Sequence, residues 1–555
     1  MTLAPPPHSR TPHRPFSGSR LRALGAGIGV STLLALTACG GAGAQSPAAD
    51  GGGDPVSGGT LRFAVGSDAG CIDPQQVGSN DSIYSTRQLV DSLTDQDPET
   101  GEIVPWLAQE WEINDDATEF TFTLQEGATF SDGTPVDSEA VAANFDRALD
   151  LGARAALIGG YLQGYEGTEI VDERTFTVTF AEPSAQFLQA TSTHTLGILH
   201  PDTVAARDDV RCESVIGSGP FVLESYTPND SISLSAREGY DWGSSLWENQ
   251  SEPYLDGIEF TVVPESGVRA GSLQSDQVDV IGNIAPQDEA QLQAAEAQLL
   301  ARTNPGIAFG LRLNHDLEVF ADEEVREAIS LAINREEIVS TVYTADTPAA
   351  TSILSSTTPD HADLSEHLGH DPQRADQLIA EAGYERTDDG GWERDGEPLE
   401  FEILWFNNAA TNAPTLELIQ QQLAAVGIGV SLQEGQVAEW QTHLSEGTFE
   451  TNWGNITRAD PDILRTTYHT DLANSYRLEP SALDDLLLEQ AAATDPQERA
   501  ELVAQAQEHL VTEYLEIPVV DLTTVLAARA EVHGVRFDSG SRVHLNDVWI
   551  EDAEQ

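Results

Sequence analysis

Apolar and polar residues follow two different periods along the chain, and the two periods alternate. Residues 119–124 and 175–180 are apolar at every second position, which is typical of a half-exposed strand. Residues 138–149 instead repeat apolar positions every three to four residues, as an amphipathic helix does. The same signals predict strands over 60–66, 231–235 and 258–263, and helices over 322–342, 415–426 and 498–515. Strands and helices mixed throughout predict two or more α/β lobes rather than a repeat array.

The N-terminus differs from the rest of the chain. Residues 1–22 carry four arginines and no acid, and the apolar run 23–38 is shorter than the roughly 18–20 residues that span a bilayer. The run ends in Leu36-Thr37-Ala38-Cys39-Gly40, which resembles a bacterial lipobox. This resemblance implies a lipoprotein signal peptide over 1–38, with a lipid joined to Cys39; an ordinary signal peptidase site is the alternative. The Gly-, Ala- and Ser-rich residues 39–58 predict a flexible tether.

Two further cysteines, Cys71 and Cys212, complete the set of three. No CxxC occurs, so the chain has neither a disulfide framework nor a zinc pattern. An extracytoplasmic address favours a bond between Cys71 and Cys212, because oxidising compartments preserve disulfides. Two buried thiols are the alternative.

The formal net charge of the chain is −65, and all 27 basic residues are arginine. The negative electrostatic field of such a chain repels nucleic acid and anionic membranes, so neither is expected as a partner. The acids are spread along the chain, which favours a solvated surface suited to concentrated salt over attraction of a cationic ligand.

Several blocks of sequence resemble one family, the large extracellular binding proteins of peptide and nickel ABC importers (family 5). The most specific is FTLQEGATFSDGTPVDSEAVAANF, and GSGPF, RAGSLQSDQVDVI and DPQRADQLIAEAGY follow in the family's order. Each block also has a structural explanation as turn and helix, so most of this signature is scaffold. The resemblance covers roughly residues 59–550.

The resemblance implies an α/β, two-lobed fold of the periplasmic-binding-protein type, in its large class with an extra subdomain. Lobe I would combine residues 59–311 with 524–555 and include a subdomain at about 106–216, and lobe II would hold 312–523. Crossing segments near 312–314 and 517–522 would form a hinge that closes on ligand.

Candidate ligand-binding residues come mainly from the segment 452–462, NWGNITRADPD, which in this family often lines the cleft. Peptide-binding members usually place an aspartate between the tryptophan and the Asp-Pro pair, but this chain has Arg458 instead. A guanidinium fork matches a carboxylate bidentately, which favours an opine-like or metal-chelating carboxylate ligand. The alternative is a structural ion pair between Arg458 and Asp460 or Asp462. The full set of candidates is Trp453, Gly454, Asn455, Arg458, Trp405, Asn407, Trp440 (core or cleft) and Ser352.

The expected function is therefore the substrate-binding component of an ABC importer, which captures a peptide or peptide-like solute and delivers it to a permease and ATPase complex. A ligand-sensing receptor would use the same fold. The chain has no GxSxG or HExxH motif, and without lysine it has no standard Walker motif, so nothing supports a secreted hydrolase. We expect a monomer with no metal and no cofactor.

Overall fold

Two open β-sheets organise the chain in this computed structural model, which describes residues 53–406, 409–472 and 474–551. The residues from Gly53 onward form one compact unit. The expected signal peptide, the lipidation site Cys39 and most of the expected tether lie outside the described residues. The two sheets belong to two lobes, as the two-lobed α/β fold requires.

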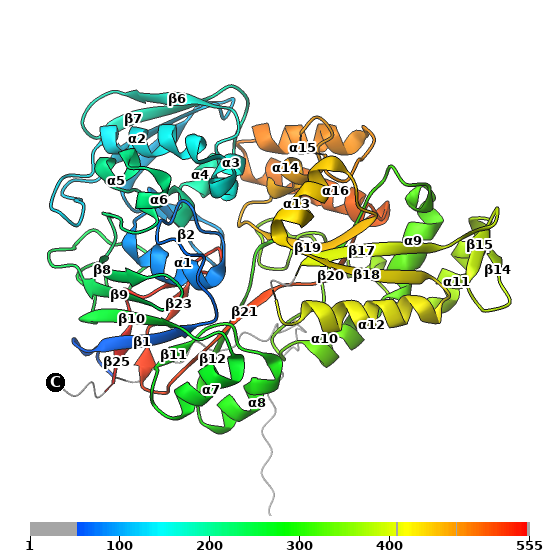
Figure 1. The fold of residues 1–555 in the computed structure, drawn as a ribbon. Helices are drawn as coiled ribbons and strands as arrows, with labels where there is room; N and C mark the ends of the chain where they lie inside the picture. Colours follow the sequence, from blue (N-terminus) through cyan, green and yellow to red (C-terminus); the bar gives the residue numbers. More distant parts are fainter. Residues whose placement is uncertain (1–52, 407–408, 473, 552–555) are drawn as a thin grey trace, which may run out of the picture. The chain divides into compact units, whose positions relative to one another are not determined.

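Lobe I is built on a seven-stranded mixed sheet (Figure 1). Its central strand β1 pairs in parallel with β10 and β11, while β21 from the C-terminal part of the chain pairs antiparallel with both β11 and β12. In sheet order the strands are β12 (Gln298–Thr303), β21 (Thr523–Ala528), β11 (Val280–Ile281), β1 (Thr60–Val65), β10 (Gly257–Val262), β9 (Ser231–Ala236) and β8 (Phe221–Thr227). The helices of lobe I outside the expected subdomain range 106–216 are α1 (Asn80–Thr86), α7 (Ser266–Gln274) and α8 (Pro286–Ala294), while α5 (Pro201–Ala205) and α6 (Asp208–Arg211) lie near the end of that range.

A four-stranded antiparallel sheet forms the subdomain within lobe I. Its strands β5 and β7 alternate between buried and half-exposed residues as the sequence predicts, because one face packs on a core of phenylalanines. Helix α2 begins where Asp137 accepts a hydrogen bond from the Ala140 amide, 2.9 Å away. The elements are β4 (Ala108–Ile113), β5 (Glu119–Leu124), β7 (Thr175–Phe180), β6 (Tyr165–Ile170), α2 (Ser138–Ala148), α3 (Ala156–Tyr161) and α4 (Phe187–Ala190).

Lobe II is built on a five-stranded sheet with β19 at its centre. Figure 1 shows α10 and α12 together along one side of this sheet, and α14, α15 and α16 grouped at its other side. The strands in sheet order are β18 (Gly429–Gly435), β17 (Glu400–Phe406), β19 (Thr451–Thr457), β13 (Gly306–Leu313) and β20 (Glu516–Val520). The helices are α9 (Glu323–Ala332), α10 (Arg335–Val342), α11 (Pro372–Glu381), α12 (Asn412–Ala425), α13 (Val437–Glu446), α14 (Ile463–Tyr468), α15 (Ala482–Ala492) and α16 (Pro496–Thr512).

Short sheets complete the fold. They are β2 (Thr94–Gln96) with β3 (Ile103–Pro105), β14 (Glu385–Arg386) with β15 (Trp392–Arg394) and β16 (Glu397–Pro398), β22 (Val532–His533) with β25 (Trp549–Ile550), and β23 (Arg536–Phe537) with β24 (Val543–His544). The hairpin of β23 and β24 matters most here, because its turn reaches the cavity described below.

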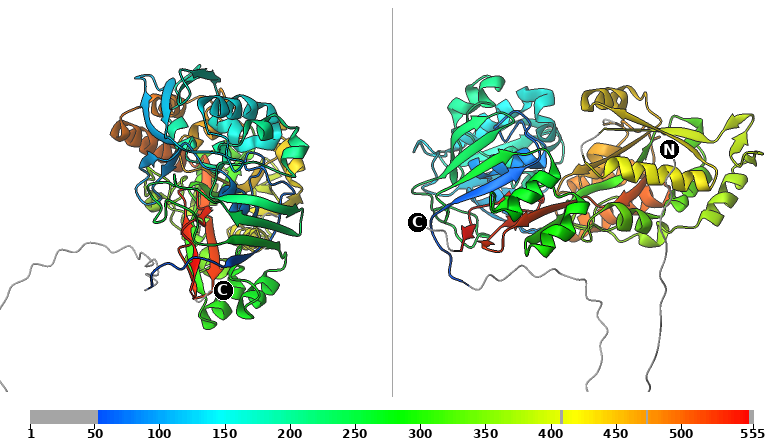
Figure 2. Two further views of the ribbon diagram at one scale, coloured as in Figure 1. Left: turned by 90° about the vertical axis from the view of Figure 1, so that its left-hand side faces the viewer. Right: turned by 60° about the horizontal axis from the view of Figure 1, so that its bottom comes forward.

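The chain passes between the sheets twice. Strand β12 ends at Thr303 and β13 begins at Gly306, while β20 ends at Val520 and β21 begins at Thr523. Figure 2 shows β20 and β21 following one another from one sheet into the other. The first crossing thus lies at residues 304–305, earlier than the expected 312–314, because β13 belongs wholly to the five-stranded sheet. The lobe limits 311/312 and 523/524 stay predictions.

One predicted helix, over residues 322–342, is instead two helices. Ile333 adopts an extended conformation, and the Asn334 side chain caps α10 by accepting a hydrogen bond from the Glu337 amide at 3.1 Å. The apolar stripe continues through this break, so periodicity alone could not locate it. A cap of this kind favours a new helix start over continuation.

Cys71 and Cys212 form a disulfide. It joins the loop after β1 to the end of α6, across 141 residues of sequence. Of the described helices, none is long and apolar enough to cross a membrane.

Candidate functional site

The segment that carries Arg458 is fixed by the end of strand β19. The Arg458 amide donates to the Pro305 carbonyl at 3.1 Å, so the segment is tied to the first crossing between the sheets. Gly306 makes this approach possible: its φ is +111°, and a Cβ there would lie 2.1 Å from the Ile456 carbonyl oxygen. The backbone hydrogen bond between Arg458 and Pro305 therefore fixes the position of Arg458 at the point where the chain passes between the lobes.

The Arg458 guanidinium is buried, with 6% of the residue exposed. It lies over the Tyr161 ring of α3 at 4.6 Å from the ring centroid. Nη1 also donates to the Gln186 side chain at 3.5 Å and to the Thr466 hydroxyl at 3.3 Å. Tyr161 and Gln186 belong to lobe I, whereas Thr466 belongs to lobe II, so Arg458 bridges the two.

The neighbouring acids do not neutralise Arg458. Asp460 pairs with Arg499 at 2.6 Å, and Asp462 pairs with Arg465 at 2.7 Å. Among the described residues, no carboxylate lies within ion-pair distance of Arg458. The alternative that Arg458 pairs with Asp460 or Asp462 is therefore not what the structure shows.

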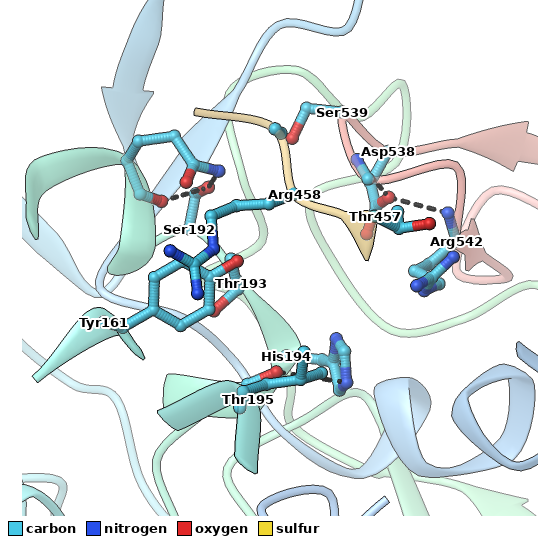
Figure 3. Close-up of a pocket in the computed structure, with 14 residues that line it drawn as sticks. Tyr161, Ser192, Thr193, His194, Thr195, Thr457, Arg458, Asp538, Ser539 and Arg542 are labelled. Atoms are coloured by element: carbon cyan, nitrogen blue, oxygen red, sulfur yellow. Dashed lines mark hydrogen bonds between the residues drawn. The ribbon is translucent and has the colours of Figure 1, made fainter. Parts of the chain in front are cut away.

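Arg458 lines a small cavity of about 40 Å³ that is open to solvent. Figure 3 shows Tyr161 beneath the Arg458 side chain, with Arg542 on another wall of the same cavity. Three regions of the chain contribute: the subdomain of lobe I, the end of β19, and the turn between β23 and β24. The lining residues are Leu157, Tyr161, Gln189, 192–195, 457–459, 538–540 and Arg542.

Arg542 is the second buried cation of this cavity, also 6% exposed. Its Nε and Nη1 atoms are buried and have no hydrogen-bond partner among the described residues. Asp538 on the same turn accepts hydrogen bonds from the Gly540 and Arg542 backbone amides at 2.9 and 2.8 Å and lies 3.9 Å from Arg87 Nε. Burial lowers the pKa of Arg542, and the Asp538 charge opposes this shift.

His194 adds polarity to the cavity but no charge near neutral pH. Burial, together with the positive charges of Arg542 and Arg87, lowers its pKa well below the ordinary value. Burial also raises the pKa of Tyr161, so its hydroxyl stays protonated. The charges on the cavity wall are thus two guanidinium groups and the Asp538 carboxylate, which already accepts backbone hydrogen bonds. Hydroxyls of Ser192, Thr193, Thr195, Thr457 and Ser539 surround them.

A second cavity adjoins the first and shares Ala459 and Ser539 with it. It is larger, with a volume of about 230 Å³. Its wall is made of residues 96–101, Arg302 and residues 356–359, and is rich in hydroxyls. Residues of both lobes line each of the two cavities.

Of the predicted ligand-binding residues that the structure describes, only Arg458 lines either cavity. Trp453 and Trp405 pack in the core of lobe II, where Trp453 stacks on Phe309 at 5.2 Å and donates to Asn412. Trp440 packs edge-on against Phe406, and the Ser352 hydroxyl donates to Gln507 at 3.0 Å. Gly454 and Asn455 lie within β19, and Asn407 is outside the described residues.

Sequence reasoning missed Tyr161, His194, Asp538 and Arg542. No local signal separates Arg542 from the other arginines, because its segment, GSRVH, matches no motif. These residues meet only through the fold: Tyr161 and Arg542 are more than three hundred positions apart.

No group of three metal-ligating side chains in the described part of the chain is arranged to hold a metal ion. The cavity instead offers guanidinium, hydroxyl and amide donors, which bind oxyanions and carbonyl groups.

Comparison with known proteins agrees with this architecture. The family of bacterial extracellular solute-binding proteins, family 5 Middle, matches residues 102–475. The dipeptide-binding protein of Escherichia coli strain K12 is 26% identical over 481 residues, covering 81% of this chain and 87% of that protein. The glutathione-binding protein GsiB of Salmonella paratyphi A is 26% identical over 477 residues, covering 82% and 88%.

Among solved structures, NikA from Brucella suis in complex with Fe(III)-EDTA has a TM-score of 0.77 at 22% identity. The match covers 89% of this chain and 100% of NikA, so the two share their fold. The family match spans the subdomain and most of lobe II. This chain belongs to the bacterial extracellular solute-binding proteins of family 5.

Proposed function

We propose that this protein captures a peptide-like solute bearing a carboxylate between its two lobes and delivers it to an ABC permease and ATPase complex. Membership of the solute-binding family supports the transport role. The relatives named above as dipeptide-binding and glutathione-binding proteins indicate small peptide-like solutes. We also propose that Cys39 carries a lipid that anchors the protein at the outer face of the cell membrane, because the segment around it resembles a lipobox.

The observation that carries the ligand proposal is that the Arg458 guanidinium has no carboxylate partner among the described residues. Each acid close to it in sequence is bound to another arginine, while Arg458 itself lines the cavity. A buried cation without a counter-ion is costly, so a carboxylate that enters the cavity gains a strong, charge-assisted pair. A peptide α-ammonium would meet mainly positive charge there. This favours carboxylate-rich ligands such as opine-like or metal-chelating amino-acid derivatives.

The test begins with mass spectrometry of the ligand that native purification retains. Isothermal titration of that ligand into ligand-free protein should show 1:1 binding without turnover. Arg458→Ala should weaken this binding at least tenfold, about 1.4 kcal/mol. Arg374→Ala is the control, because Arg374 is partly exposed and pairs only with Glu381 at the surface. Turnover of the ligand, or an unchanged affinity of Arg458→Ala, would refute the proposal.

A further inference from the structure

Arg542 differs from every other buried arginine that the structure describes. Arg211, Arg312 and Arg465 each form an ion pair with a carboxylate, and Arg335 donates to several backbone carbonyls. The Arg542 side chain makes no hydrogen bond and no ion pair within the described residues, and two of its three nitrogens are buried without a partner. A buried donor that has no acceptor costs stability, so this arrangement indicates a partner that the protein itself does not supply.

The surroundings of Arg542 do not supply that partner. Asp538 supplies the main negative charge that acts on Arg542, but its Oδ1 accepts two backbone hydrogen bonds and its Oδ2 lies 3.9 Å from Arg87 Nε. The other ionisable groups acting on Arg542 are the hydroxyls of Tyr84 and Tyr161, which are neutral at ordinary pH because burial raises the pKa of each. Positive charge therefore exceeds negative charge at this wall, in a chain whose net charge is −65.

Arg542 and Arg458 line the same cavity but come from different lobes. Arg542 stands on the β23–β24 hairpin of lobe I, and Arg458 follows β19 of lobe II. In Figure 3 the two side chains come from separate segments of the ribbon and do not touch. A single carboxylate on Arg458 would leave Arg542 without a counter-ion.

Resting on the proposed function, we propose that Arg542 is a second anion-binding residue and that the ligand is a dianionic small solute, with one oxyanion group at Arg458 and the other at Arg542. Two carboxylates joined by a short linker fit this chemistry, because each guanidinium presents a fork of donors. The ligand then links the lobes electrostatically, since each anionic group binds an arginine of a different lobe. A monoanionic or zwitterionic solute satisfies only half of the site.

The first measurement needs no ligand. Protein is stripped by unfolding and refolding, and the melting temperature is compared for wild type, Arg542→Gln and Arg542→Met. Both variants remove an unpaired buried charge, so their melting temperatures should equal or exceed that of wild type. Arg465→Gln is the matched control: Arg465 is 5% exposed but pairs bidentately with Asp462, and its loss should lower the melting temperature.

The second measurement uses simple anions as probes, at constant ionic strength. Linear dicarboxylates from malonate to adipate are compared with monocarboxylates of the same chain length for their shift of the melting temperature. At least one dicarboxylate should stabilise wild-type protein more than its monocarboxylate, and Arg542→Gln should abolish this difference.

Two results would overturn the proposal. One is that no dicarboxylate exceeds its monocarboxylate. The other is that Arg542→Gln and Arg542→Met lower the ligand-free melting temperature as much as Arg465→Gln, or fail to fold, which would make Arg542 structural. If the solute retained on purification loses affinity in Arg458→Gln but not in Arg542→Gln, this inference fails while the proposed function stands.

Discussion

Gly160 offers a way to displace the Arg458 guanidinium without changing its charge. A Cβ built on Gly160 would lie 2.2 Å from Arg458 Nη2, whereas ordinary van der Waals contact begins at 3.4 Å. In Gly160→Ala the guanidinium must therefore retreat by about 1 Å, which its flexible stem allows. The backbone of α3 can stay in place, because the clash involves only the end of a side chain.

The expected loss follows from hydrogen-bond geometry. A shift of about 1 Å takes an N–H···O contact of about 2.9 Å beyond the hydrogen-bond limit. One charge-assisted hydrogen bond is worth about 1.5–3 kcal/mol, so the Kd for the carboxylate ligand should rise about 10- to 100-fold. The fold should not weaken, because alanine is favoured over glycine within a helix by roughly 0.5–1 kcal/mol.

Gly159→Ala is the matched control. Gly159 precedes Gly160 in the same helix, and a Cβ there meets no atom of the described residues within 4 Å. Both variants should melt at or slightly above the wild-type temperature in ligand-free form, and isothermal titration should show weaker binding for Gly160→Ala alone. Equal affinities for the two variants would show that the placement of Arg458 does not govern binding.

Three further predictions concern stability and kinetics. Cys71→Ser with Cys212→Ser should lower the urea-derived free energy of unfolding by about 3–5 kcal/mol, because the bond closes a loop of 141 residues; an unchanged midpoint would contradict this. Burial raises the pKa of the Asp521 carboxyl group to about 6. The folded state therefore binds the carboxyl proton more tightly than the unfolded chain does, and the stability that this gives is lost as pH rises from 3.8 to about 6. Asp521→Asn should therefore gain stability relative to wild type over that range in pH-dependent melting, and a constant difference would refute the assignment. The net charge of −65 repels an anionic ligand at long range, so stopped-flow association rates should rise with added salt, and a fall would contradict the expected field.

The half-exposed strands were predictable from sequence because one of their faces meets solvent. Residues 119–124 and 175–180 form β5 and β7 with the predicted bounds. Strands β13 and β20, by contrast, are buried along their whole length, so they carry no alternation to detect. The burial of β19 also explains why Trp453 packs in the core: a central strand sends side chains into packed layers on both faces.

The candidate site was predictable only where a family segment marked it. Arg458 stood out because the resemblance to the family led us to expect an acid in its segment, and the sequence has an arginine there. Arg542 did not, because its importance comes from burial and from missing partners, which are properties of the assembled fold. In a chain with 27 arginines, residue type alone could not select it.

The position of β21 bears on the order in which this protein can fold. This strand lies inside the seven-stranded sheet, between β11 and β12, although more than two hundred residues of lobe II separate it from both in sequence. Lobe II is continuous and its sheet is complete once β20 has been made, whereas lobe I must wait for β21 and the segment after it to fill its sheet. The same late segment carries Arg542. Binding competence should therefore be the last property the newly made protein acquires, and a chain that ends just after β20 should fold lobe II yet bind nothing.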